Sequence, residues 1–217
     1  MIPGRAIPNV ITVARIALCP VIFALIFVPT FAARFTAWIL FLIAAFSDLW
    51  DGYLARKHGW ISDFGKLVDP IADKLLLVAT FIPFYILSNR DPTDHSFPVI
   101  DTLPLWIVLV IFGRELFITL FRSYAARRGV VIPAGPSGKY KAVFQNVFVG
   151  SAILWYALLA EANLRGWDGP VWRGWVGFHF AFSVVVLTIA VILTIYSMFV
   201  YLWNYRSLVL ANDRVGG

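Results

Sequence analysis

Six long apolar stretches follow one another along the chain, and each comes close to the roughly 20 helical residues that cross a hydrocarbon core. They lie near residues 9–28, 36–57, 67–88, 104–126, 139–160 and 174–205. Hydrophobic residues make up 60% of the chain and charged residues 14%, whereas soluble domains average about 45–50% and about 25%. A soluble globule and a disordered chain are therefore excluded. We predict an all-α polytopic membrane protein, a bundle of six transmembrane helices that forms a single domain over residues 1–217.

The basic residues predict how these helices are oriented. Only four of the 18 Lys and Arg residues fall on the side opposite the N-terminus, namely Arg34, Arg90, Arg165 and Arg173. Because Lys and Arg gather in cytosolic loops, we expect both termini to be cytosolic. In so apolar a chain, the net charge of +6 indicates contact with anionic lipid and not with nucleic acid. Pro20 interrupts the first stretch and no cleavage site follows, so we interpret this stretch as a span and not a signal peptide. With no transit peptide evident, we expect a prokaryotic inner membrane.

Four aspartates flank the loop between the second and third stretches. Asp48 and Asp51 are three residues apart near the end of one predicted helix, so they share a face. Asp69 and Asp73 are four apart near the start of the next and share a face as well. At about 1.5 Å per residue, an antiparallel hairpin would place all four roughly 5–14 Å below the cytosolic end. We therefore expect the four carboxylates to meet.

Four carboxylates in a partly desolvated place need positive charge beside them, since like charges disfavour joint ionisation. Oxygen ligands select hard divalent ions, and the single cysteine, Cys19, excludes a multi-cysteine metal site or a disulfide framework. The alternative is that the aspartates pair with nearby cations: Arg56, Lys57, Lys66 and Lys74. Acids at membrane depth usually mark function, so we favour the metal site.

Small residues and an arginine accompany the first aspartate pair. Gly52 and Ala55 share its face and would leave space for a ligand, although close helix packing is the alternative interpretation. Arg56 could grip a phosphate with two hydrogen bonds.

The residues Asp48, Asp51, Gly52, Ala55, Arg56, Gly65, Asp69 and Asp73 stand at the spacing D-x2-D-G-x2-A-R-x8-G-x3-D-x3-D. This string resembles the complete signature of the CDP-alcohol phosphotransferases. The resemblance implies a six-helix membrane bundle, a homodimer, and transfer from a CDP-linked lipid or alcohol to a hydroxyl acceptor with release of CMP. It further implies that Asp48, Asp51, Asp69 and Asp73 hold one or two Mg²⁺ or Mn²⁺ ions, and that Asp73 is the catalytic base. Asp48, Gly52, Ala55, Arg56 and Gly65 would bind the CDP group.

The acceptor must be inferred from a second region, between the fourth and fifth stretches. Arg114 and Glu115 lie inside an apolar stretch, where they need a partner or a wet cavity. Lys139 and Lys141 stand at the start of the next helix, whose positive dipole end attracts anions. We therefore expect an anionic acceptor such as a phosphomonoester, held by Arg114, Arg122, Lys139 and Lys141. The alternative is a basic loop that only sets topology, which we favour for Arg127 and Arg128.

This region, together with Pro8, Asn9, Thr12 and Arg15, resembles the phosphatidylglycerophosphate synthases within the family, over about residues 7–156. The resemblance implies CDP-diacylglycerol as donor and glycerol 3-phosphate as acceptor. CDP-diacylglycerol-dependent cardiolipin synthases share much of the pattern, and inositol-phosphate or serine acceptors are further alternatives. From a different class, a divalent-cation transporter would also cluster carboxylates, but transport sites usually lie near the midplane on broken helices. A noncatalytic scaffold would have no need to bury four acids.

Overall fold

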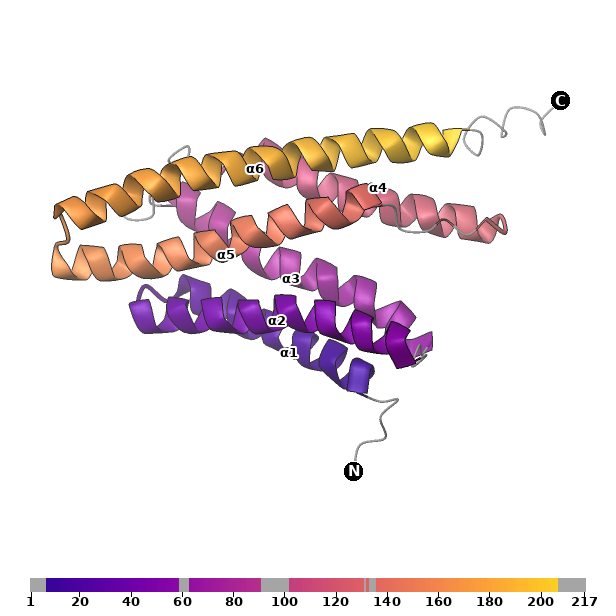
Figure 1. Cartoon of the computed structure of the whole chain (residues 1–217), viewed down its shortest axis with the longest axis horizontal. Helices are drawn as coiled ribbons and strands as arrows, with labels where there is room; N and C mark the ends of the chain where they lie inside the picture. The colour runs from indigo at the N-terminus through magenta and orange to yellow at the C-terminus, as the bar shows by residue number, and fades with distance from the viewer. Residues whose placement is uncertain (1–6, 59–62, 91–101, 131, 133–135, 207–217) are drawn as a thin grey trace. The chain divides into compact units, whose positions relative to one another are not determined.

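The structure is a computed structural model that describes residues 7–58, 63–90, 102–130, 132 and 136–206. Within the helices, the side chains of residues 7–8, 48–49, 51–56, 58, 63–64, 66–67 and 136–137 are not described. The described ranges form six α-helices: α1 (Ile7–Phe27), α2 (Phe31–His58), α3 (Asp63–Arg90), α4 (Leu105–Arg127), α5 (Pro136–Arg165) and α6 (Pro170–Asn204) (Figure 1). The predictions of an all-α protein and of six helices are confirmed.

The helices extend beyond the apolar stretches that predicted them. The fifth helix was expected over residues 139–160, and α5 spans Pro136–Arg165. The sixth was expected from residue 174, and α6 begins at Pro170. Proline favours the first position of a helix, because its missing N–H would have no helical partner there and its φ angle already suits the helix. Hydropathy indicates the membrane-embedded part of a helix, whereas a proline at the first position indicates where the helix itself begins.

Four of the described helices are long and apolar enough to cross a membrane: Asn9–Phe27, Val68–Arg90, Gly138–Arg165 and Pro170–Asn204. The part of α2 with described side chains before the first aspartate pair, Phe31–Ser47, is also apolar. Helix α4 carries Arg114, Glu115 and Arg122 within its apolar stretch. Four of the six expected spans are thus long and apolar enough to cross a membrane, and a bundle of six membrane spans stays a prediction.

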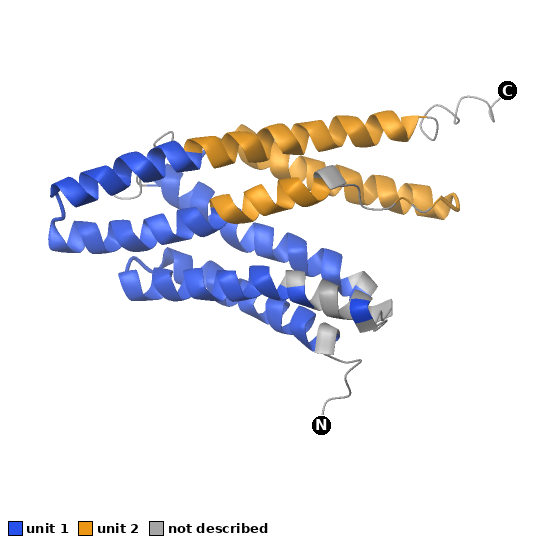
Figure 2. Cartoon of the chain, viewed as in Figure 1, with its two compact units in different colours: residues 1–103, 149–183 blue, residues 104–148, 184–217 orange. Residues whose placement is uncertain are grey.

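The chain divides into two compact units, coloured separately in Figure 2. Unit 1 contains residues 1–103 and 149–183, and unit 2 contains residues 104–148 and 184–217. Helices α5 and α6 each contribute one part to each unit.

In unit 1, α1 packs against both α2 and α3, which lie beside it in Figure 1. Gly150 of α5 lets that helix approach α2 closely, because a Cβ added there would lie 3.3 Å from Cε1 of Phe41. The rings of Phe84 and Tyr156 stack with centroids 5.7 Å apart. These contacts join α2, α3 and α5 around a core of buried side chains that includes Ile22, Ile26, Ala37, Phe41, Phe81, Phe84, Ile153 and Tyr156.

Arg34 connects α2 to the backbones of α1 and α5. Its side chain is 2% exposed; Nε donates to the carbonyl of Ile26 (3.2 Å) and Nη1 to the carbonyl of Tyr156 (3.1 Å). The guanidinium carbon also lies 5.5 Å from the centre of the Tyr156 ring. A buried guanidinium is tolerated because it satisfies backbone acceptors near the end of α1 and within α5.

Unit 2 is built from α4 and the parts of α5 and α6 that belong to it. Ile118, Ala125, Ile132 and Tyr201 form its described core cluster, with Phe117, Phe121, Val130 and Tyr205 packed against them. Helix α4 ends beside Gly129, whose φ of 76° is a left-handed conformation that glycine adopts without steric cost. The residues that follow can then fold back, and Ile132 joins the cluster.

Candidate functional site

Two of the four signature aspartates are described, and α1 contacts both. Thr12 donates from Oγ1 to Oδ1 of Asp69 at 2.7 Å, and Arg15 donates from Nη1 to Oδ1 of Asp73 at 2.9 Å. Thr12 and Arg15 are each 1% exposed, whereas the Asp73 side chain is 59% exposed. The carboxylate of Asp73 is thus held by a buried arginine, while more than half of its side chain is exposed.

The spacing of these contacts defines how α1 and α3 run. The hydrogen-bonded partners are separated by 57 residues in one pair and 58 in the other. A nearly constant separation means that the two helices are parallel and in register along this face. Thr12 and Arg15 share one face of α1, and Asp69 and Asp73 share one face of α3. The prediction that Asp69 and Asp73 lie on one face is therefore confirmed.

The other half of the predicted site lies outside the described side chains. The backbone of α2 is helical through Asp48, Asp51, Gly52, Ala55 and Arg56, but their side chains are not described. Gly65 lies in the first turns of α3 and is partly buried. Among the described side chains, no three His, Cys, Asp or Glu residues gather. The meeting of all four carboxylates therefore stays a prediction.

The described carboxylates suit a hard divalent cation. Asp69 and Asp73 present oxygen atoms four residues apart, and α1 already holds one oxygen of each. Mg²⁺ and Mn²⁺ prefer oxygen ligands, and protein carboxylates that bind metal are themselves usually held by hydrogen bonds. The buried donors from α1 match this pattern.

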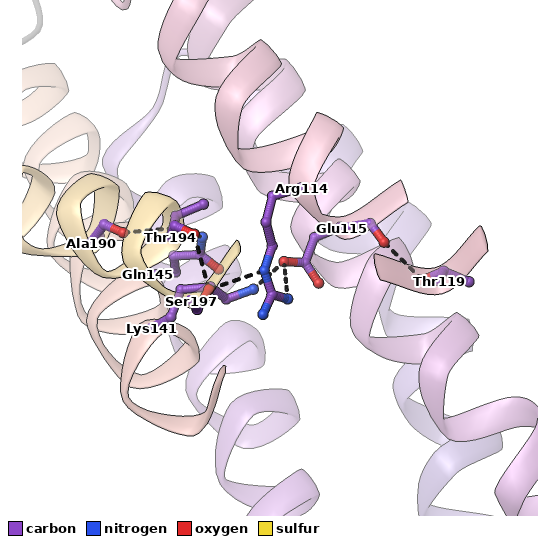
Figure 3. Close-up of polar contacts among 8 residues, drawn as sticks. All are labelled: Arg114, Glu115, Thr119, Lys141, Gln145, Ala190, Thr194 and Ser197. Carbon is purple, nitrogen blue, oxygen red and sulfur yellow. Dashed lines mark hydrogen bonds and ion pairs between the residues drawn. The ribbon is translucent and has the colours of Figure 1, made fainter. Parts of the chain in front are cut away.

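A second polar cluster lies in unit 2, where α4, α5 and α6 bring their charged and hydroxyl side chains together (Figure 3). Glu115 accepts through Oε1 from Nη1 of Arg114 at 3.0 Å and is also paired with Nζ of Lys141. Side-chain exposures are 11% for Arg114, 22% for Glu115 and 5% for Lys141. The expectation that Arg114 and Glu115 need partners inside an apolar helix is confirmed.

Helix α6 orients this cluster through two hydroxyl groups. Ser197 accepts from Nε of Arg114 at 3.2 Å and donates to the carbonyl of Thr194 at 2.9 Å. Thr194 in turn accepts from the amide of Gln145 at 3.2 Å. Figure 3 shows these side chains converging from the three helices. Sequence reasoning treated the last helix as merely apolar and missed both residues, although two buried hydroxyl residues three apart in an apolar helix are a usable signal.

The four predicted acceptor-binding residues do not all belong to one cluster. Arg114 and Lys141 meet at Glu115, and a Cβ added to Gly138 would lie 3.6 Å from Nη2 of Arg114, so α5 begins close to the arginine. Lys139 is exposed. The guanidinium carbon of Arg122 lies 5.9 Å from the ring centre of Tyr201, beside the aromatic cluster. The structure therefore brings together two of the four.

The one histidine with a described side chain has a structural role. His179 is 2% exposed, its Nε2 lies 3.0 Å from the carbonyl of Ser151, and its ring stacks on Trp155. A carbonyl only accepts, so Nε2 carries the proton, and Nδ1 accepts from the hydroxyl of Ser183 at 3.3 Å. Both ring nitrogens are thereby satisfied, in line with the prediction that this histidine is not a metal ligand. The side chains of His58 and His95 lie outside the described residues.

Several long apolar helices that carry partnered charges are consistent with an integral membrane protein whose polar sites are built into its helices. Residues 5–196 match the CDP-alcohol phosphatidyltransferase family, a range that includes Thr12, Arg15 and every predicted site residue. This match is to the family as a whole, whereas the finer likeness to the phosphatidylglycerophosphate synthases was expected over about residues 7–156.

Named relatives agree with this match. A Mycobacterium tuberculosis protein named "Probable phosphatidylglycerophosphate synthase" is 34% identical over 201 residues, which cover 89% of this chain and 80% of the relative. A Bacillus subtilis protein named CDP-diacylglycerol–glycerol-3-phosphate 3-phosphatidyltransferase is 38% identical over 161 residues, covering 68% and 76%. A Haemophilus influenzae protein of that name is 29% identical over 208 residues, covering 95% and 96%. The chain belongs to the CDP-alcohol phosphatidyltransferase family and is an enzyme of phospholipid biosynthesis.

The buried ion pairs of Glu115 generate a prediction about stability. Glu115→Gln removes the carboxylate from two largely buried cations, so we expect the free energy of unfolding to fall by about 3 kcal/mol. Reversible denaturation of the purified protein in detergent micelles measures this loss. Glu161→Gln is the matched control, because Glu161 pairs with an Arg165 side chain that is 66% exposed. The control should lose less than about 1 kcal/mol. If both variants lost the same free energy of unfolding, the claim that the buried ion pairs of Glu115 stabilise the fold would be contradicted.

Proposed function

We propose that this enzyme transfers the phosphatidyl group from CDP-diacylglycerol to glycerol 3-phosphate, giving phosphatidylglycerophosphate and CMP. The family supports the donor and the reaction type. The names of the relatives support glycerol 3-phosphate as the acceptor, since these relatives align with most of this chain. The observation that supports an anionic acceptor is that two cations, Arg114 and Lys141, both pair with Glu115 near the start of α5.

We assign binding of the CDP-lipid donor to the C-terminal end of α2 and the N-terminal end of α3. Asp48, Asp51, Asp69 and Asp73 would hold one or two Mg²⁺ or Mn²⁺ ions, and Gly52, Ala55, Arg56 and Gly65 would bind the CDP group together with Asp48. Bound divalent ions would neutralise charge on the pyrophosphate and make CMP a better leaving group. The described geometry supports this assignment, because the Asp69 and Asp73 carboxylates are oriented by buried donors.

Asp73 is proposed as the catalytic base. Its carboxylate is 59% exposed, so an acceptor hydroxyl can approach while Nη1 of Arg15 holds Oδ1. Asp73 would take the proton of the acceptor hydroxyl as that oxygen attacks the phosphorus on the lipid side of the pyrophosphate. The new P–O bond forms as the bond to CMP breaks.

The acceptor is assigned to the basic residues of unit 2. Arg114 and Lys141 provide two cations that Glu115 keeps oriented, and Lys139 and Arg122 add positive charge on the same helices. A phosphomonoester dianion would bind these cations through charge-assisted hydrogen bonds. Cardiolipin synthesis is the alternative, because its acceptor, phosphatidylglycerol, is also anionic.

The membrane arrangement is part of the same proposal. All six helices would cross a prokaryotic inner membrane, with both termini and the site facing the cytosol, and the enzyme would act as a homodimer. The four long apolar helices and the bacterial relatives support this arrangement. A site at the cytosolic interface would admit the donor from the lipid and a polar acceptor from water.

An acceptor panel tests the reaction. Purified enzyme with Mg²⁺ or Mn²⁺ and CDP-diacylglycerol should release CMP with glycerol 3-phosphate at least tenfold faster than with phosphatidylglycerol, inositol phosphate or serine. Faster release with phosphatidylglycerol would instead establish a cardiolipin synthase. No release with any hydroxyl acceptor would overturn the proposal.

Replacing the proposed base tests the mechanism. Asp73→Asn should lower kcat by about 10²–10⁴-fold, the usual contribution of a positioned general base. Size-exclusion chromatography checks that the variant is folded, and CMP release measures turnover. Asp168→Asn, which changes an exposed aspartate in the turn between α5 and α6, should keep wild-type turnover. Near-normal activity of Asp73→Asn would remove this residue from the mechanism.

The basic cluster predicts how acceptor affinity is distributed. Lys141→Met should raise the KM for glycerol 3-phosphate about tenfold or more, because a hydrogen bond to a charged group is lost. The KM for CDP-diacylglycerol should change little. Arg127→Met is the matched control, since Arg127 is exposed in the last turn of α4 and is expected only to set topology. Equal KM values in both variants would argue against an acceptor site at Lys141.

A further inference from the structure

The contact between α1 and α3 joins two residues with no assigned role to two proposed metal ligands. Thr12 and Arg15 are each 1% exposed, and each donates to a different signature aspartate. Both contacts lie within unit 1, so they belong to one compact body.

The position of Arg15 calls for an explanation. It lies in the middle of α1, in a stretch that is long and apolar enough to span a membrane. A guanidinium there is unfavourable unless it is paired, and Nη1 reaches Asp73 at 2.9 Å. Pairing alone could be structural, as the contacts of Arg34 with backbone carbonyls show. Arg15 differs because its partner is a signature carboxylate that is 59% exposed.

Thr12 gives independent support. A buried threonine in a helix can satisfy its hydroxyl with the carbonyl four residues earlier, as Thr80 does with Leu76 and Thr194 with Ala190. The hydroxyl of Thr12 also reaches across to another helix, where it donates to Oδ1 of Asp69 at 2.7 Å. This contact fixes a carboxylate on α3, which a bond within α1 would not do.

Each contact engages one oxygen of a carboxylate. Fixing one oxygen of a carboxylate restricts rotation of the side chain, and so limits where the other oxygen can lie. Since α1 and α3 are parallel and in register here, both carboxylates are held from the same helix. Such hydrogen bonds to metal-binding carboxylates typically change metal affinity or activity 10–100-fold when removed.

We infer that Thr12 and Arg15 are positioning residues that orient the carboxylates of Asp69 and Asp73 for divalent-cation binding and turnover. This inference rests on the proposed metal role of the aspartates. Neither residue touches substrate in this scheme, and both act through the aspartates. The first helix therefore contributes to the site, although the signature string lies entirely in α2, α3 and the loop between them.

The cleanest test uses Thr12, because its replacement changes no charge. Thr12→Val should bind Mn²⁺ about 10–100-fold more weakly than the wild type, measured by electron paramagnetic resonance of free Mn²⁺ with detergent-purified enzyme and no CDP-lipid. Thr12→Ser keeps the hydroxyl and should bind within about threefold of the wild type, as a control on the role of that donor.

Arg15 is tested through turnover. Arg15→Met should lower kcat about 10–100-fold at saturating Mn²⁺ and substrates, with little change in the KM for glycerol 3-phosphate. Arg15→Lys should recover part of kcat, since an ammonium can donate to one carboxylate oxygen but lacks the planar fork. Arg34→Met is the matched control: it removes a buried arginine from the same unit, and should lower stability while leaving Mn²⁺ affinity and kcat unchanged.

The outcomes separate this inference from the proposed function. Wild-type enzyme that binds no Mn²⁺ would overturn the metal site and this inference with it. Suppose instead that the wild type binds Mn²⁺, that folded Thr12→Val binds it equally well, and that folded Arg15 variants keep the wild-type kcat. This result would overturn the inference and leave the metal site standing. If Arg15→Met does not fold, the Arg15→Lys and Thr12 variants decide the question.

Discussion

The cost of placing charge inside apolar helices determines how this protein is organised. Arg15 in α1, Arg34 in α2 and Arg114 in α4 are each largely or fully buried, and each donates to an acceptor on another helix. An unpaired charge in hydrocarbon is unfavourable by several kcal/mol. Each pairing therefore fixes which helix faces lie together, because the helix that carries the charge must face the helix that carries the acceptor. In this chain the pairings of Arg15 and Arg114 also lie at the proposed sites, whereas the pairing of Arg34 is structural.

The apolar pattern predicted the number and type of helices because long hydrophobic runs have few alternatives to a helix in lipid. The same pattern placed Asp69 and Asp73 on one face, since spacing within a helix is fixed by its geometry. Boundaries were less accurate at α5 and α6, where Pro136 and Pro170 begin helices outside the apolar runs. Helix α4 carries charges within its apolar stretch, so hydropathy alone does not establish it as a span.

Contacts between helices were harder to predict than contacts within one. The sequence indicated that Arg114 and Glu115 needed partners, but not that Lys141 and Ser197 would provide them. Thr12 and Arg15 stood out in the sequence only through a family resemblance, because their partners lie 57 and 58 residues away. A periodicity argument covers a few turns of one helix, whereas such pairings depend on the arrangement of the whole bundle. The side chains of Asp48 and Asp51 lie beyond what the structure describes, so their part in the site stays a prediction.

The separation between Arg15 and Asp73 has a consequence for biogenesis. A ribosome makes α1 first, and 58 more residues must follow before the carboxylate partner exists. Throughout that interval the first helix carries a cation whose final counter-ion has not yet been synthesised. Entry of α1 into the lipid and arrival of α3 beside it are thus coupled events. The nascent chain completes its charge balance only when its third helix is in place.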